Sequence, residues 1–287
     1  MSAPESGVVA SGVGESPIAT PPVTRRLDAI ESVFQVMLVT LRRALRGKRL
    51  VMAGALLALP CILAWTVARG REPAMQEEFL YSMLTFYQFG IAVPGLALLM
   101  ATAFPWPESD EGTLTYWFTA PVRRWTIHLG RILASLLVGI VLLPLAILAL
   151  ALPLDPGEGV AIGGAIRTSA TATMLAFPAY LGFFTLMSTW TRRGLIAGVI
   201  LIMIENSLSL VTGNLARMTI VFYVRSLLWP AASPAGRTVL ERAARIDDPA
   251  APSTAIGIFL AVAIVSIALS LVIVELTEYR GKHGQPG

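Results

Sequence analysis

Residues 132–154 read ILASLLVGIVLLPLAILALALPL, an apolar stretch without a charged side chain. A helix that crosses the hydrocarbon core of a bilayer needs about 20 apolar residues, so this stretch alone predicts a membrane-spanning helix. The whole chain agrees, because 55% of its 287 residues are hydrophobic, only 14% are charged, and its mean hydropathy is +0.70. Such a composition excludes an ordinary cytosolic enzyme and indicates one polytopic membrane domain.

Other charge-free stretches of similar length predict further spans, at 50–68, 79–104, 168–191 and 254–274. We expect one more span at 194–216, although Glu205 and Asn206 interrupt it. Residues 218–229 are short for a span, so we expect a re-entrant or interfacial segment there, with a seventh span as the alternative. The sequence therefore predicts an all-α integral membrane protein with six transmembrane helices.

Prolines fall inside four of these predicted spans, at Pro60, Pro94, Pro144 and Pro178. Each proline lacks an N–H, which frees a carbonyl group and bends the helix. The bends serve a conformational switch, or they reflect only the greater frequency of proline in membrane helices.

The residues before the first span form two parts. Residues 1–23 are rich in Ser, Gly, Pro and Ala and show no periodicity, so we expect a disordered cytoplasmic tail that is not a secretory signal. Residues 24–50 have apolar side chains at three- and four-residue steps and end in a basic cluster of Arg42, Arg43, Arg46, Lys48 and Arg49. This pattern predicts an amphipathic helix in the cytoplasmic membrane interface, or a helix packed on another helix.

Lys and Arg are distributed unevenly over the predicted loops. With the N-terminus inside, the cytoplasmic segments hold fourteen of them and the two short outer loops hold three. Basic residues resist translocation, so both termini are expected in the cytoplasm, with the chain in the cytoplasmic (inner) membrane. The same bias accounts for the net charge of +4 without a nucleic-acid partner. The six-span domain then covers 51–280, and a cytoplasmic tail covers 281–287.

The cytoplasmic loop at 105–131 is the most informative segment. Its acidic residues, such as Asp110, favour the start of a short helix, which Pro121 ends. Bulky apolar side chains share one face of this helix, namely Leu114, Trp117 and Phe118. Such a face either docks on a partner or anchors the helix at the lipid interface.

This loop resembles the first cytoplasmic loop in permease subunits of type-2 ATP-binding-cassette (ABC) transporters. The resemblance rests on an acidic residue before Glu111-Gly112-Thr113-Leu114, on Pro121-Val122-Arg123-Arg124, and on Gly130-Arg131. It extends to the interfacial helix, the six spans and an outer re-entrant region at 217–253, and it covers roughly residues 24–280. The resemblance implies that the loop contains a coupling helix, which docks into a groove of a separate ATPase subunit.

The residues implied in ATPase coupling are Asp110, Glu111, Gly112, Thr113, Leu114, Trp117, Phe118, Arg123 and Arg124. We expect the helix to transmit ATPase motion through Glu111, Leu114 and Trp117, while Arg123 and Arg124 fix the loop against lipid headgroups or the partner. The resemblance also implies an exporter that works with a second permease copy or a homologous permease. The chain lacks a Gly-x-x-x-x-Gly-Lys-Ser/Thr loop, so ATP and Mg²⁺ are expected on the partner ATPase and no cofactor on this chain.

Glu205 and Asn206 are polar residues in the predicted fifth span. Glu205 follows Arg193 by twelve residues, which places it roughly 18 Å deep in a hydrocarbon core of about 30 Å. Carboxylates at this depth usually face a cavity or a partner, so both residues are candidates for a translocation pathway. The alternative is a protonated or paired glutamate that helps helices to pack. On the same helix, Gly194-x-x-x-Gly198 permits close packing.

A competing class of function is an orphan membrane enzyme, or a membrane assembly factor that does not use ATP. Glu77-Glu78 resembles the paired glutamates of membrane metalloproteases, but His128 and His283 fall outside the predicted spans. We therefore interpret the two glutamates as surface carboxylates. The methionines are scattered, which disfavours a copper site, and the single Cys61 excludes an intramolecular disulfide.

Overall fold

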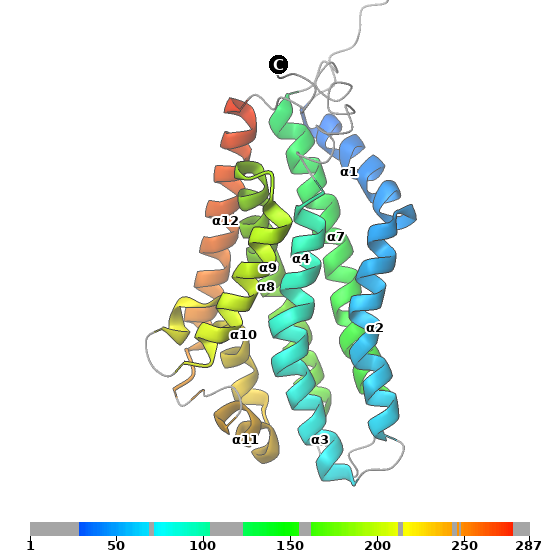
Figure 1. Cartoon of the computed structure of the whole chain (residues 1–287), viewed down its shortest axis with the longest axis vertical. Coiled ribbons are helices and arrows are strands. Elements are labelled where there is room, and N and C mark those ends of the chain that lie inside the picture. Colours follow the sequence, from blue (N-terminus) through cyan, green and yellow to red (C-terminus); the bar gives the residue numbers. More distant parts are fainter. Residues whose placement is uncertain are drawn as a thin grey trace, which may run out of the picture.

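The structure, a computed structural model, describes residues 29–68, 72–103, 123–154, 162–211, 215–242, 246 and 248–277. All regular secondary structure in these ranges is helical (Figure 1). The α-helices are α1 (Ala29–Arg46), α2 (Lys48–Ala68), α3 (Pro73–Ser82), α4 (Val93–Ala101), α7 (Arg124–Ala151), α8 (Ile162–Trp190), α9 (Gly194–Ser209), α10 (Ile220–Leu228), α11 (Pro234–Arg242) and α12 (Pro252–Leu276). Three short or irregular helices join them, namely the π-helix η1 (Met83–Ala92) and the 3₁₀-helices η2 (Ala216–Met218) and η3 (Trp229–Ala231).

Five helical stretches within the described part are long and apolar enough to cross a membrane, as predicted. They are Lys48–Ala68, Met75–Ala101, Arg124–Ala151, Gly163–Trp190 and Pro252–Leu276. The second of them runs without a break through α3, η1 and α4. The protein is therefore a multi-pass membrane protein by the length and composition of its helices.

The two remaining apolar helices are shorter than these five. Helix α9 has 16 residues, which corresponds to about 24 Å, and the nine residues of α10 correspond to about 14 Å. Helix α10 is too short to cross a hydrocarbon core of about 30 Å. It packs against α8, α9, η1 and α12.

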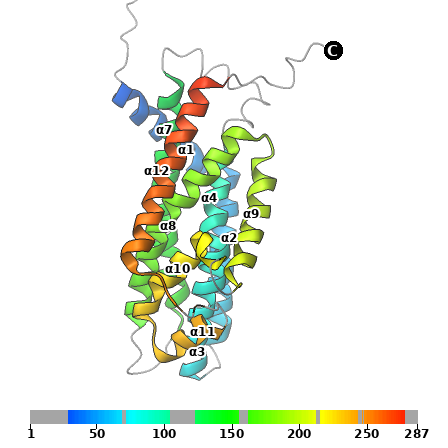
Figure 2. The same ribbon diagram turned by 90° about the vertical axis from the view of Figure 1, so that its left-hand side faces the viewer.

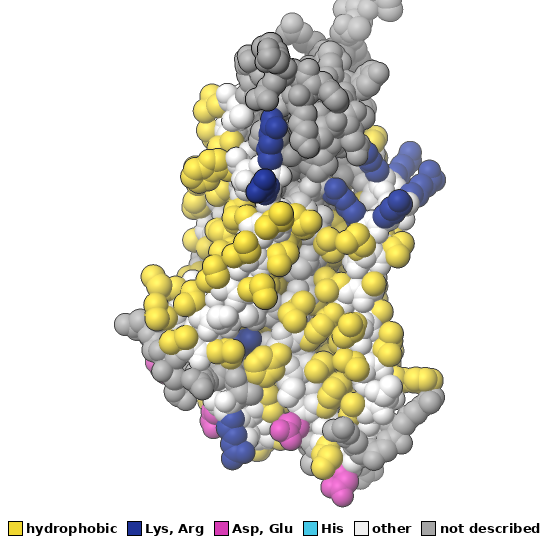
Figure 3. Space-filling view, in the orientation of Figure 1, with side chains coloured by type: hydrophobic (Ala, Val, Ile, Leu, Met, Phe, Trp, Pro, Cys, Tyr) yellow, Lys and Arg dark blue, Asp and Glu magenta, His cyan; other side chains and the backbone are white. Residues whose placement is uncertain are grey.

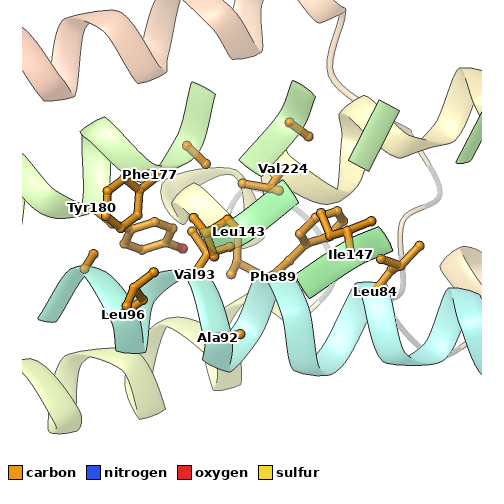
Figure 4. Close-up of a cluster of buried hydrophobic side chains, with 14 of the residues drawn as sticks. Leu84, Phe89, Ala92, Val93, Leu96, Leu143, Ile147, Phe177, Tyr180 and Val224 are labelled. Atoms are coloured by element: carbon orange, nitrogen blue, oxygen red, sulfur yellow. The ribbon is translucent and has the colours of Figure 1, made fainter. Parts of the chain in front are cut away.

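The second span lies at the centre of the bundle. Of its most apolar stretch 67% is buried within the chain, compared with 22% for α2 and for α12. Large side chains of η1 and α4, such as Phe89 and Val93, meet Leu143 of α7 and Tyr180 of α8 in a cluster that Val224 of α10 completes (Figure 4). The outer helices instead carry exposed leucine, isoleucine and valine side chains, as expected of surfaces that contact lipid.

Helix α1 packs along α7 and leaves a second apolar stripe uncovered. Gly130 of α7 marks the crossing, because a Cβ atom there would lie 2.8 Å from the carbonyl oxygen of Val33 and 2.9 Å from Cβ of Val36. Ile30 and Phe34 of α1 remain 85% and 54% exposed. Helix α1 therefore packs on another helix with one face, while an apolar face beside it stays exposed.

Basic side chains gather at one end of the bundle, where α1 and α2 meet and α7 begins (Figure 3). Among the exposed residues there are Arg42, Arg43, Arg46, Lys48 and Arg123. At the opposite end, α11 packs on α3 (Figure 2). Helix α11 carries basic residues of its own, Arg237 and Arg242, at this end.

Candidate functional site

Most of the predicted coupling residues lie outside the described residues. These are Asp110, Glu111, Gly112, Thr113, Leu114, Trp117 and Phe118, within 104–122. The two helices that this segment connects are described, and α7 begins at Arg124. Near the basic end, a cavity of about 40 Å³ has a lining that includes Thr40 of α1, Met100 of α4, His128 of α7 and Thr185 of α8. Residues 104–122 therefore connect α4 to α7 at the end of the bundle where these two helices line a cavity together with α1 and α8.

Arg123 and Arg124 stand at the start of α7. Arg123 is exposed and its carbonyl oxygen accepts from the backbone N–H of Thr126 at 3.1 Å. Arg124 is partly buried, and its Nη1 donates to the carbonyl oxygen of Thr277 at 3.2 Å. Next to it, the backbone N–H of Trp125 donates to the Glu275 carboxylate at 3.2 Å, where a negative charge favours a helix N-terminus. The start of α7 is thus tied to the end of α12.

His128 lies inside helix α7, so the expectation that both histidines fall outside the spans is wrong for this one. The helix begins at Arg124, well before the charge-free stretch that starts at residue 132. His128 is only 2% exposed, and its Nε2 lies 3.3 Å from Oγ of Ser270 on α12. Its contact with a hydroxyl group on a neighbouring helix indicates a role in helix packing. Within the described ranges, no three His, Cys, Asp or Glu side chains cluster as metal ligands would.

Glu205 lies at the junction of three helices and is 8% exposed. Its Oε1 accepts from the hydroxyl of Tyr180 on α8 at 2.9 Å and from the backbone N–H of Val221 at 3.0 Å. Val221 belongs to the first turn of α10, whose N–H groups lack partners within the helix. Thr219 caps the same turn by accepting from the N–H of Phe222 at 3.2 Å. Glu205 therefore fixes the start of α10 to α8 and α9, as the packing alternative predicts.

Arg225 of α10 is the charged residue that sequence reasoning did not assign to the site. It is 1% exposed, its Nε donates to the carbonyl oxygen of Thr85 at 3.2 Å, and its Nη1 donates to Oγ of Ser209 at 2.8 Å. Its guanidinium group lies 5.4 Å from the centre of the Phe86 ring. The signal was present in the sequence, since an arginine in an apolar run near a buried glutamate suggests a compensating charge.

Asn206 completes the contact between α9 and the central span. Its Nδ2 donates to the carbonyl oxygen of Gly90 at 2.7 Å and to that of Ile202 at 2.9 Å. Pro94 follows Gly90 by four residues and has no N–H with which to form the usual helical bond to this carbonyl. Gly90 is required for the close approach, because a Cβ atom there would lie 2.4 Å from Oδ1 of Asn206. Asn206 thus supplies a side-chain donor to a carbonyl group that Pro94 cannot bond.

Close packing of α9 at its two glycines is confirmed. A Cβ atom on Gly198 would lie 2.2 Å from a methyl carbon of Leu98 on α4, and one on Gly194 would lie 3.0 Å from Cα of Ser188. Small residues at these positions let the helices approach each other.

Glu77 corrects a second expectation. The pair at 77 and 78 was interpreted as two surface carboxylates, but Glu77 is 7% exposed and only Glu78 is exposed. Helix α11 packs on α3, where Tyr81 fills the space that a side chain on Gly236 would occupy. The hydrophobic pattern of α3 did not reveal this cover, because α11 is separated from it by more than 150 positions in the sequence.

No family model matches this chain, and no curated protein matches it.

Proposed function

We propose that this chain is the membrane-spanning permease subunit of an ATP-driven ABC transporter. In this proposal a separate ATPase subunit hydrolyses ATP, and the loop at 105–131 couples that hydrolysis to movement of the spans. The residues of the loop that resemble type-2 permeases motivate the proposal. The arrangement of the helices around the ends of the loop supports it.

The observation that carries the proposal is the set of contacts at the start of α7. Gly130 contacts α1 at Val33 and Val36, while Arg124 and Trp125 bond to the end of α12. A displacement of the loop would pull on α7 and, through these contacts, on α1 and α12 together. A coupling element needs such a connection, whereas a lipid anchor does not.

The distribution of charge supports the proposed orientation. Basic residues gather at the end where α7 begins, and such residues are retained on the cytoplasmic side of a membrane. Both termini and the loop would then lie in the cytoplasm, where an ATPase subunit can reach the loop. Helix α9 would be the fifth of the six spans in chain order, and α10 with α11 would form the outer re-entrant region.

The proposal of a second permease is consistent with the size of one cavity that the described residues line. The cavity beside His128 measures about 40 Å³, whereas sites for small-molecule ligands usually measure about 300–1,000 Å³. It has room for a few water molecules but not for a transported compound. A translocation pathway would instead form between two permease copies, and the family resemblance favours export.

Trp117 provides the test of ATPase coupling. We expect Trp117→Ala to weaken retention of the ATPase by roughly thirtyfold, since truncation of an aromatic hot spot costs about 2 kcal/mol or more. The measurement is co-purification of the ATPase in mild detergent, together with substrate-dependent ATP turnover. The ATPase to use is the product of an adjacent reading frame that encodes a P-loop.

Trp117→Tyr is the matched control, because tyrosine is also favoured at a lipid interface. Both variants must first reach wild-type levels in the membrane. Wild-type retention of the ATPase and wild-type turnover in both variants would refute coupling through this residue. If Glu111→Ala leaves assembly intact but separates turnover from transport, the coupling role is supported further.

A further inference from the structure

The cavity near the basic end of the bundle has a lining that suits an anion. It measures about 40 Å³ and lies among α1, α4, α7 and α8. Its lining residues include Arg131 and two threonines, Thr40 of α1 and Thr185 of α8. Among the described residues of the lining there is no Asp or Glu. A positive charge with hydroxyl donors beside it favours an anion over a metal cation.

Arg131 belongs to the face of α7 that borders this cavity. His128 and Ser135 also line it, three residues before and four residues after Arg131. The hydroxyl of Ser135 donates to the carbonyl oxygen of Arg131 within the helix at 3.0 Å. A guanidinium group has five N–H donors, so Arg131 can bond an anion and a protein group at the same time.

The depth of Arg131 matches the level of lipid phosphate groups. It is the last charged residue of α7, and residues 132–151 continue the helix. These twenty residues correspond to about 30 Å, which is the thickness of the hydrocarbon core. Arg131 therefore lies where the hydrocarbon core meets the headgroups, and this is where a phospholipid carries its phosphate.

The surroundings and the size of the cavity fit the same group. Thr40 shortly precedes the exposed basic residues of α1 and α2 at the basic end (Figure 3). The cavity is partly open, and Thr40 and Arg131 are themselves only partly buried. Its volume admits about three water molecules, which is enough for one phosphate group but not for an acyl chain. Basic pockets between transmembrane helices on the cytoplasmic side bind phosphorylated lipid headgroups.

We propose that this cavity binds the phosphate group of one anionic phospholipid, whose acyl chains remain in the bilayer. Arg131 pairs with the phosphate, and the hydroxyls of Thr40 and Thr185 donate to its oxygens. The lipid thereby links α1, α7 and α8 at the headgroup level. In the orientation proposed above, it belongs to the inner leaflet. The site does not require an ATPase partner, so it can fail while the coupling proposal stands.

Native mass spectrometry of the detergent-purified protein tests the site, because it counts the lipids bound to the folded chain. The probes are phosphatidylglycerol, phosphatidylcholine and inorganic phosphate. We expect Arg131→Gln to weaken the binding of phosphatidylglycerol by about tenfold or more, since a charge-assisted bond is lost. Arg46→Gln is the matched control, because it removes an exposed charge at the same end that does not line the cavity. It should change the binding by less than about twofold.

Thr40→Val provides a second test that preserves the shape of the side chain. Loss of one hydroxyl donor should weaken the binding of phosphatidylglycerol by about two- to tenfold. Phosphatidylcholine should bind more weakly than phosphatidylglycerol, because its choline group brings a positive charge close to Arg131. Equal losses in Arg131→Gln and Arg46→Gln, wild-type binding in both Arg131→Gln and Thr40→Val, or equal binding of the two lipids would overturn the proposal. Retention of inorganic phosphate in place of the lipid would overturn it as well, since the ligand would then be free phosphate.

Discussion

Replacing Glu205 by alanine tests how α10 is held in the bundle. The change removes the acceptor for the Tyr180 hydroxyl and for the backbone N–H of Val221, and both donors are buried. Each buried donor without an acceptor costs about 1–3 kcal/mol. For the two donors together, we expect Glu205→Ala to lower the free energy of unfolding by about 2–6 kcal/mol.

Glu205→Gln separates hydrogen bonding from charge. Its side-chain oxygen still accepts from Tyr180 and Val221, so we expect a loss below about 1.5 kcal/mol. The measurements are detergent-induced unfolding of the purified protein and limited proteolysis at 215–242. In Glu205→Ala, cleavage there should precede loss of the five long helices. Equal stability of the alanine variant and wild type, or equal damage by glutamine and alanine, would refute this account.

Two further changes test helix contacts. Gly130→Leu should lower the free energy of unfolding by about 1–3 kcal/mol through overpacking against α1. The control Gly54→Leu, with nothing within 4 Å of its Cβ position, should have little effect in the same unfolding assay, and equal losses would contradict the crossing. Asn206→Leu should cost about 1–3 kcal/mol because the Gly90 carbonyl loses its donor. Unchanged stability of that variant would mean that the proline is accommodated without Asn206.

The long spans could be predicted because hydropathy is a local property. A charge-free run such as 132–154 specifies a membrane helix whatever surrounds it, and the structure has helices at all five such runs. The limits of the helices were less predictable, since α7 begins at Arg124 and brings His128 into the helix. The first turns of α7 contain both polar and apolar side chains, and a hydropathy average over such residues does not show where the helix begins.

The contacts of the candidate site could be predicted only in part. A buried glutamate at 205 was visible from its position in an apolar run, but its partners Tyr180 and Val221 were not, because they belong to other helices. Nor did the pattern of α3 reveal that α11 packs on this helix or that Glu77 is buried. Pairing between distant segments depends on how the helices pack, and a single sequence contains no direct record of that packing.

The attachment of α10 also constrains the order in which the membrane domain is made. Arg225 bonds Thr85 and Ser209, and both residues precede α10 in the sequence. Glu205, which bonds the N-terminus of α10, also precedes this helix. A ribosome that synthesises the chain from its N-terminus therefore delivers a buried arginine only after the groups that bond it have been synthesised. The same helix placed earlier in the chain would have to enter the membrane without those groups. The order of the helices in the sequence thus ensures that the bonding partners of Arg225 are already present when this buried side chain is synthesised.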